Sequence, residues 1–142
     1  MVSLVLISHS RALAEAAADL AKKVSPKSDI PVFAAGGTGS SHEELGTDAY
    51  DILETLEKAY SSDGVLILAD LGSAVISTKV AIGMLDDIKR ANAFLSSAPI
   101  VEGAIGAAVQ IAAGSSIDEV KEEALNALVG KQSEIGDDEN AQ

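Results

Sequence analysis

The sequence contains no cysteine and no tryptophan, and it has only two histidines among its 142 residues. Without cysteine there are no disulfides, thiolate zinc sites or cysteine nucleophiles. Any reactive imidazole must therefore belong to His9 or His42. No apolar stretch is long enough to span a bilayer, and the N-terminus lacks the basic region and cleavage site of a secretory signal, so we expect a cytoplasmic protein.

Positive charge is also scarce, because 10 lysines and arginines face 22 acidic residues and leave a formal net charge of -12. Such a charge repels both a phosphate backbone and an anionic membrane surface, so we expect neither nucleic acid nor a membrane as a partner. The excess favours a self-repelling, soluble surface, or docking to a basic protein surface. Part of it lies in the acidic tail GDDENAQ.

The apolar content of 47% in 142 residues fits one domain with a core large enough to fold without disulfides. Four short runs rich in valine, isoleucine, leucine or other apolar residues predict strands. These strands are expected at 2–7, 30–35, 64–69 and 92–97.

Helical spacing of apolar residues and helix-cap signals predict five helices between and after these strands. In the last of them, Ser115 or Ser116 is the expected cap, and Gly130 is the expected end. The predicted domain therefore covers residues 1–130, and the acidic residues 131–142 are expected to be a disordered tail. The helices are expected at 11–24, 47–61, 73–88, 99–114 and 115–130.

Strands that alternate with helices predict an α/β, flavodoxin-like, three-layer sandwich around a mainly parallel four-stranded sheet of order 2-1-3-4. In such a sheet a crevice opens beyond the carboxyl ends of the first and third strands. His9 follows the first of these strands and Asp70 follows the third. The sequence therefore places a histidine and a carboxylate where folds of this class bind ligands.

His9 could be a packing or capping residue, but its surroundings favour phosphoryl chemistry. Ser8 and Ser10 flank it with hydroxyl groups, and Asp70 is the carboxylate best placed to orient its ring. A neutral imidazole can attack phosphorus through one nitrogen while the other donates to a carboxylate. The loops AGGTG (35–39) and GSA (72–74) offer backbone amides and hydroxyls that could neutralise a phosphoryl group.

His42 lies in a glycine- and serine-rich loop at 36–46. A chain with two separated histidines and no cysteine offers a poor ligand set for a metal, so we expect no metal site and a solvated His42 side chain, or one that contacts a partner. The sequence has neither a Walker loop nor a dinucleotide fingerprint. Ser-His-Asp hydrolysis also fits badly, because no serine lies in a Gly-x-Ser-x-Gly elbow.

The segments ISHSRALAE, AAGGTG....LGT, GVLILADLGSA...T and APIVEGAI resemble the phosphotransferase subunits of phosphoenolpyruvate-dependent dihydroxyacetone kinases, whose domain is similar to mannose-type IIA domains. The resemblance covers about residues 1–129. It implies that His9 is phosphorylated and that Asp70 is its hydrogen-bonding partner. The phosphate pocket that we expect comprises Ser8, Ser10, Gly37, Thr38, Gly72 and Ser73.

By the same resemblance, His9 accepts phosphate from the histidine-containing phosphocarrier protein and passes it to ADP on the nucleotide-binding subunit of the kinase. The chain itself then binds no cofactor, because ADP and ATP stay on that partner subunit. Two alternatives remain: a mannose-type IIA component of a sugar transporter, and a regulatory module that senses phosphorylation.

The resemblance also implies a homodimer. An alanine stripe in the predicted helix 99–114 allows another helix to approach closely, either between subunits or by packing on the sheet of the same chain. The stripe consists of Ala104, Ala107, Ala108 and Ala112.

Overall fold

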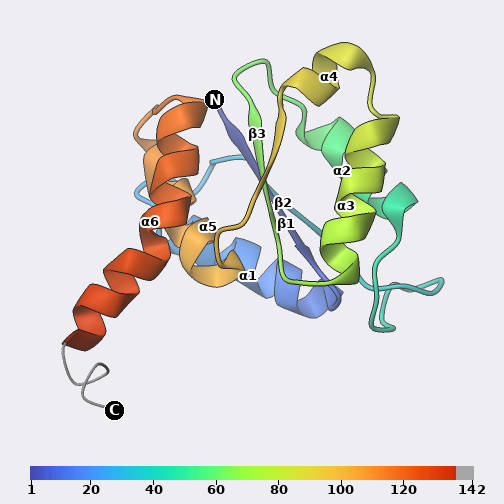
Figure 1. The fold of residues 1–142 in the computed structure, drawn as a ribbon, viewed down its shortest axis with the longest axis horizontal. Coiled ribbons are helices and arrows are strands. Elements are labelled where there is room, and N and C mark those ends of the chain that lie inside the picture. The colour runs from blue at the N-terminus through green and yellow to red at the C-terminus, as the bar shows by residue number, and fades with distance from the viewer. Residues whose placement is uncertain (137–142) are drawn as a thin grey trace.

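In the computed structural model, which describes residues 1–136, a parallel sheet lies between two layers of helices (Figure 1). The strands are β1 (Ser3–Ser8), β2 (Val32–Gly36), β3 (Val65–Ala69) and β4 (Ala93–Ser96). The helices are α1 (Arg11–Val24), α2 (Ala49–Ala59), α3 (Ser73–Met84), α4 (Asp87–Ala91), α5 (Ile100–Ala112) and α6 (Ile117–Ile135).

The sheet has the order β2-β1-β3-β4, and all three strand pairs are parallel. This order and the α/β sandwich confirm the predicted fold class. In the register of the sheet, Ser8 pairs with Gly36 and Ile7 pairs with Ala69. The segments that follow β1, β2 and β3 therefore leave the sheet at one edge, so that residues distant in sequence meet there.

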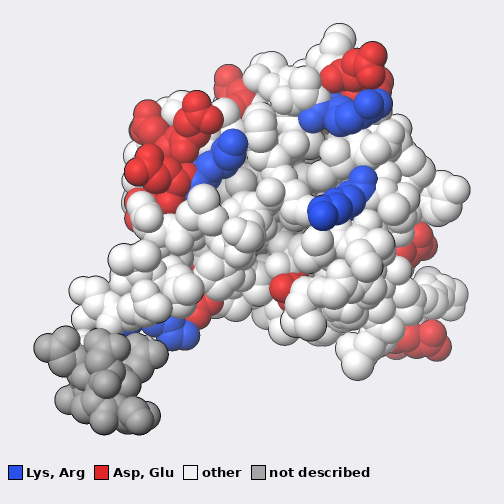
Figure 2. All heavy atoms as spheres, in the orientation of Figure 1, with Lys and Arg blue, Asp and Glu red and all other residues white. Residues whose placement is uncertain are grey.

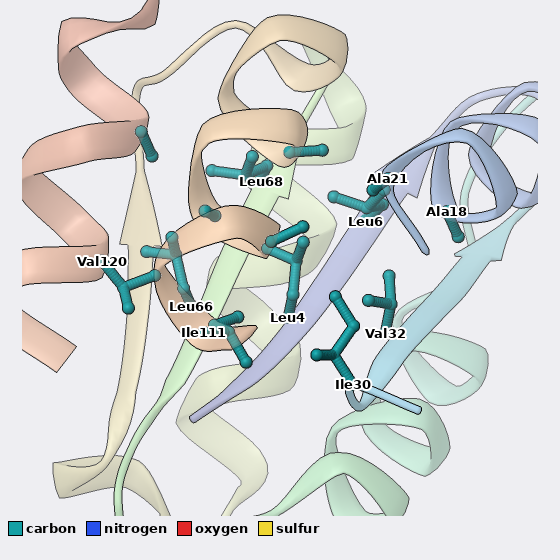
Figure 3. Packing of buried hydrophobic residues seen from close by; sticks show 14 of the residues in the cluster. Leu4, Leu6, Ala18, Ala21, Ile30, Val32, Leu66, Leu68, Ile111 and Val120 are labelled. Carbon is teal, nitrogen blue, oxygen red and sulfur yellow. The ribbon is translucent and has the colours of Figure 1, made fainter. Parts of the chain in front are cut away.

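Successive side chains of the central strands point to opposite faces of the sheet, and both faces are buried. Leucines at alternate positions face α1, α5 and α6 (Figure 3), and the intervening valines and isoleucines face α2 and α3. The first set contains Leu4, Leu6, Leu66 and Leu68, and the second contains Val5, Ile7, Val65 and Ile67. This two-sided burial explains why the strands are continuous apolar runs.

The structure divides the predicted helix 73–88 into two, so that the described residues hold six helices where five were expected. The helix α3 ends at Met84, and Leu85 is extended and buried. Asp86 then begins α4 by accepting a hydrogen bond from the Lys89 amide with its side chain. Asp86 therefore marks a new helix cap, which the apolar spacing alone had concealed.

The end of α6 also differs from the prediction, because this helix passes through Gly130 and ends at Ile135. Gly130 keeps a helical conformation, and a glycine stops a helix most effectively when it adopts the left-handed one. Lys131 on the next turn pairs with Glu102 of α5 at 2.8 Å, which ties this part of α6 to the fold. The rest of the tail that was predicted to be disordered, residues 137–142, lies outside the described residues.

The start of α6 agrees with its predicted cap, since the Ser116 side chain accepts a hydrogen bond from the Glu119 amide. The alanine stripe of α5 lies inside the core, where all four side chains are buried. These alanines therefore pack within one chain and are not free for a subunit contact. Among residues 1–136, no helix is both long and apolar enough to cross a membrane.

Candidate active site

His9 and Asp70 meet at the edge of the sheet where β1 and β3 end. The Asp70 amide donates to the Ile7 carbonyl at 3.0 Å, which continues the pairing of the two strands by one residue. The His9 ring then lies beside the Asp70 carboxylate, with Nδ1 of His9 3.0 Å from Oδ1 of Asp70. The predicted pairing of these two residues is therefore present in the structure.

The Asp70 carboxylate is held from several sides. Its Oδ2 accepts hydrogen bonds from the His9 amide at 3.0 Å and the Ser8 hydroxyl at 2.8 Å, and its Oδ1 accepts one from the Leu71 amide at 2.7 Å. Burial raises the pKa of Asp70, but these hydrogen bonds and the one with the His9 ring together lower the pKa below its ordinary value. Asp70 is therefore a fixed carboxylate near neutral pH.

A carboxylate acceptor at Nδ1 favours the imidazole tautomer that carries its proton on Nδ1. The other ring nitrogen, Nε2, then has a free electron pair, and it lies 2.7 Å from the Ser73 hydroxyl. The His9 side chain is 32% exposed, so its ring is accessible from solvent. Nε2 is therefore the ring nitrogen that is arranged to act as a nucleophile.

The first turn of α3 lies next to Nε2, because Ser73 is the first residue of that helix. Gly72 immediately before it has φ of 55°, a left-handed conformation that suits glycine. Within residues 1–136, the amides of Gly72 and Ser73 donate to no other group. A helix N-terminus with free amides stabilises an anionic group, so this turn can neutralise negative charge beside Nε2.

Ser8 and Ser10 have different roles from the predicted one. The buried Ser8 hydroxyl donates to Asp70 and accepts a hydrogen bond from the Ser10 amide at 3.1 Å. The Ser10 side chain caps α1 by accepting a hydrogen bond from the Leu13 amide. Both hydroxyls hold the turn around His9 in place, and the Ser8 hydroxyl uses its hydrogen on Asp70, whereas the Ser10 hydroxyl only accepts a hydrogen bond within the described residues.

Two glycines of the 36–46 loop have no room for a side chain: Gly36 packs against the His9 turn, and Gly37 packs against His42 within the loop. A Cβ on Gly36 would lie 2.1 Å from the Ser8 carbonyl oxygen, and one on Gly37 would lie 1.9 Å from the His42 carbonyl oxygen. Thr38 is committed within the loop, because its amide donates to Glu44 at 2.7 Å. Gly37 and Thr38 therefore shape the loop beside the site, and the Thr38 amide is not a free phosphate donor.

His42 differs from the predicted solvated histidine. Its backbone is left-handed, with φ of 59°, and its side chain is only 34% exposed. The Nδ1 atom is buried without a hydrogen-bond partner and lies 4.0 Å from Oδ2 of Asp51. No group of three or more potential ligands within residues 1–136 could hold a metal ion.

Two parts of the site were not identified from the sequence: the contacts of the LGT motif, and Arg11. In the motif, the Gly46 amide donates to the His9 carbonyl at 2.9 Å, and the Thr47 hydroxyl lies 2.8 Å from the Ser77 hydroxyl on α3. The motif itself can be seen in the sequence, but these contacts with two other segments depend on the fold. Arg11 joins the loop to Asp51 through its guanidinium.

The chain is similar to known proteins in sequence and in fold. Residues 3–121 match the family model EIIA-man, described as the PTS system fructose IIA component. The chain is 37% identical over 136 residues to the "PEP-dependent dihydroxyacetone kinase, phosphoryl donor subunit DhaM" of Klebsiella michiganensis, and 35% identical over 136 residues to that of Escherichia coli K12. These matches cover 96% of the chain but only 29% of each relative's length.

A shorter relative matches over nearly its whole length. The "PEP-dependent dihydroxyacetone kinase 2, phosphoryl donor subunit DhaM" of Listeria innocua is 32% identical over 126 residues, which cover 89% of this chain and 98% of that protein. A solved structure, described as unknown function protein EF1359, has a TM-score of 0.75 and 35% identity, and the match covers 88% of this chain and 93% of that one. With this fold, this site and these matches, the chain belongs to the EIIA-man family and resembles its dihydroxyacetone kinase phosphoryl donor subunits.

Proposed function

We propose that the chain is a phosphoryl relay protein of a phosphoenolpyruvate-dependent dihydroxyacetone kinase. Nε2 of His9 accepts the phosphoryl group from a histidine-containing phosphocarrier protein and passes it to ADP on the nucleotide-binding kinase subunit. The observation that carries this proposal is the unequal pairing of the imidazole, with Asp70 at Nδ1 and Ser73 at Nε2. The kinase role rests on the donor subunits that the chain resembles.

In the first transfer, the electron pair of Nε2 attacks the phosphorus atom of the incoming phosphohistidine. The new nitrogen–phosphorus bond forms as the donor's nitrogen–phosphorus bond breaks, and the donor imidazole keeps that electron pair. Asp70 holds the Nδ1 proton and stabilises the positive charge that develops on the ring. The Ser73 hydroxyl and the amides of Gly72 and Ser73 then face the phosphoryl oxygens.

In the second transfer, an oxygen of the ADP β-phosphate attacks phosphorus, the bond to Nε2 breaks, and the electron pair returns to the ring. Phosphoryl transfer depends mainly on positioning and electrostatic stabilisation. This chain has no Walker loop and no dinucleotide fingerprint to hold a nucleotide in line with His9. The partner subunit therefore supplies the nucleotide site.

The surface around His9 supports docking of a partner. The site is open, and two exposed leucines stand on the segments beside it: Leu45 on the 36–46 loop and Leu71 after Asp70. One group of acidic side chains lies over the start of α6, at the upper left of Figure 2, and the 36–46 loop beside the site carries the exposed Glu43 and Glu44. The group over α6 consists of Asp118, Glu119, Glu122 and Glu123. The start of α6 borders a hollow with Met1 and Asp63, at the sheet edge opposite His9. This negative charge would orient an approaching basic partner.

The isolated phosphoprotein is expected to transfer its phosphate rapidly to the ADP-loaded kinase subunit and only slowly to free ADP. The reason is that only the subunit holds the nucleotide in line with the phosphohistidine. Loss of phosphohistidine and formation of ATP are followed after mixing with each acceptor. Fast ATP formation with free ADP alone would overturn the relay. Transfer to neither acceptor would favour a module that senses phosphorylation.

We also propose a homodimer. Because the alanines of α5 are buried in the fold, a subunit contact has to use another surface. The outer side of α3 is apolar, with Ile76, Val80 and Met84 exposed at intervals of four residues. Light scattering at micromolar concentration is expected to give twice the chain mass of 14.4 kDa. A monomer mass under these conditions would contradict the proposal.

A further inference from the structure

Arg11 connects three segments around the site. It is the first residue of α1, two positions after His9, and its Nε donates to the Gly36 carbonyl at 3.0 Å. Its Nη2 donates to Oδ2 of Asp51 on α2 at 2.7 Å. Both side chains are mostly shielded from solvent, with 27% and 14% of their surfaces exposed. The guanidinium therefore forms a partly buried bridge between the start of the 36–46 loop and α2.

The 36–46 loop has few other attachments. Its backbone is left-handed at Gly37, Gly39 and His42, and its one large apolar side chain, Leu45, is 79% exposed. Inside the loop, the amides of Thr38 and Glu44 donate to each other's carbonyls. A loop with almost no buried apolar surface depends on a small number of polar contacts for its position.

Those polar contacts converge on the turn that carries His9. Arg11 holds the start of the loop at Gly36, while the Gly46 amide holds its end by donating to the His9 carbonyl. The His42 side chain lies near Asp51, with Nδ1 4.0 Å from Oδ2, and borders the same hollow as Arg11. The conformation of the loop and that of the nucleophile's own backbone are therefore linked.

We propose that Arg11, oriented by Asp51, is a positioning residue for phosphoryl transfer. It keeps the 36–46 loop against the His9 turn, where the Gly46 amide holds the His9 carbonyl, so that the backbone that carries the His9 ring stays fixed in line with the phosphoryl donor. This inference rests on the proposed relay function. Arginine suits the task because its planar fork can donate to two acceptors in fixed directions, which lysine cannot do.

Arg11→Gln removes the bridge, and Lys23→Gln is its matched control. Each variant removes one positive charge from α1, which takes the formal net charge from -12 to -13. Lys23 is 75% exposed, and within residues 1–136 it pairs only with Asp19 on its own helix. In Arg11→Gln, amide hydrogen exchange at Thr38 and Glu44 is expected to accelerate by about tenfold, because the loop opens more often. The control is expected to keep the parent exchange rates.

The rate of transfer tests the positioning role. In Arg11→Gln the kcat for phosphorylation is expected to fall by about 10- to 100-fold. The KM for the phosphocarrier is expected to rise by less than the kcat falls, because Arg11 bonds to Gly36 and Asp51 of its own chain and affects docking only through the loop that carries Leu45. Asp51→Asn is expected to cause a smaller loss, and Arg11→Lys to recover part of the rate. The double variant Arg11→Gln/Asp51→Asn is expected to be no slower than Arg11→Gln.

Two results would overturn the proposal. Unchanged exchange at Thr38 and Glu44 in Arg11→Gln would show that the bridge does not hold the loop. Faster exchange with an unchanged kcat would show that the loop's position does not matter for transfer. Failure of the proposed function is a separate result, because the parent chain would then take up no phosphate on His9, whatever the exchange rates show.

Discussion

We expect His9→Ala to take up no phosphate and His42→Ala to be phosphorylated to the same extent as the parent chain. The two histidines differ in their surroundings. Nε2 of His9 faces the Ser73 hydroxyl and the first turn of α3, while Nδ1 of His42 is buried near Asp51. Only His9 has an oriented, accessible nitrogen beside groups that can stabilise a phosphoryl group.

The measurement starts from phosphoenolpyruvate, enzyme I and the phosphocarrier, with labelled phosphate followed into each purified variant. A label on His9 should be acid-labile, as a phosphohistidine is, and should map to the peptide that contains residue 9. His9→Gln serves as a second variant, because glutamine retains a polar side chain at this partly exposed position. Circular dichroism checks that each variant is folded. Label kept by His9→Ala and lost by His42→Ala would reverse the assignment.

Much of the site was predictable because it depends on strand ends. A parallel sheet of order 2-1-3-4 brings the residues after its first and third strands together, and these residues are His9 and Asp70. The position of Ser73 is predictable for the same reason, because it is the first residue of the helix that follows the third strand. The continuous apolar strands identified the sheet, and helix spacing identified most of the layers around it.

The remaining features depend on contacts that no local pattern encodes. Ser8 and Ser10 were expected to bind phosphate because they flank His9, but each hydroxyl is used within the turn, one on Asp70 and the other as a helix cap. Arg11 and Asp51 are 40 positions apart, and their bridge forms only after α2 packs beside the loop. Sequence proximity therefore identified the reactive group, whereas the groups that hold it in place required the fold.

The helix ends show the same limit. The apolar residues Ile82, Leu85 and Ile88 keep helical spacing across the break, so this spacing could not locate the boundary between α3 and α4. Gly130 was a reasonable stop signal, but it does not adopt the left-handed conformation that terminates a helix. The helix continues past it at the modest propensity cost of one glycine, and the next residue, Lys131, pairs with Glu102 of α5.

Asp70→Asn is expected to fold and to transfer phosphate about 10- to 1000-fold more slowly than the parent chain. An asparagine amide can donate to Nδ1, which would favour the tautomer with its proton on Nε2 and so remove the nucleophilic electron pair. Asp70→Ala is expected to lose a similar share of the transfer rate, because the ring then has no orienting acceptor.

Asp87→Asn is the control, since it removes one charge from a side chain that is 97% exposed. Single-turnover phosphorylation of each folded variant measures the effect, and a parent rate in Asp70→Asn would exclude Asp70 from the mechanism.

The pH dependence of stability gives an independent test of the same carboxylate. The pKa of Asp70 is lowered in the folded chain, so its ionised form stabilises the fold at pH values above its unfolded pKa of about 3.9. This contribution is lost as the pH falls through the lower pKa of the folded state. The difference in free energy of unfolding between the parent and Asp70→Asn should therefore be largest near neutral pH and shrink below about pH 4. Denaturant unfolding at a series of pH values measures this difference. A difference that stayed constant on acidification would mean that Asp70 is not stabilised as a carboxylate by its contacts with Ser8, His9 and Leu71.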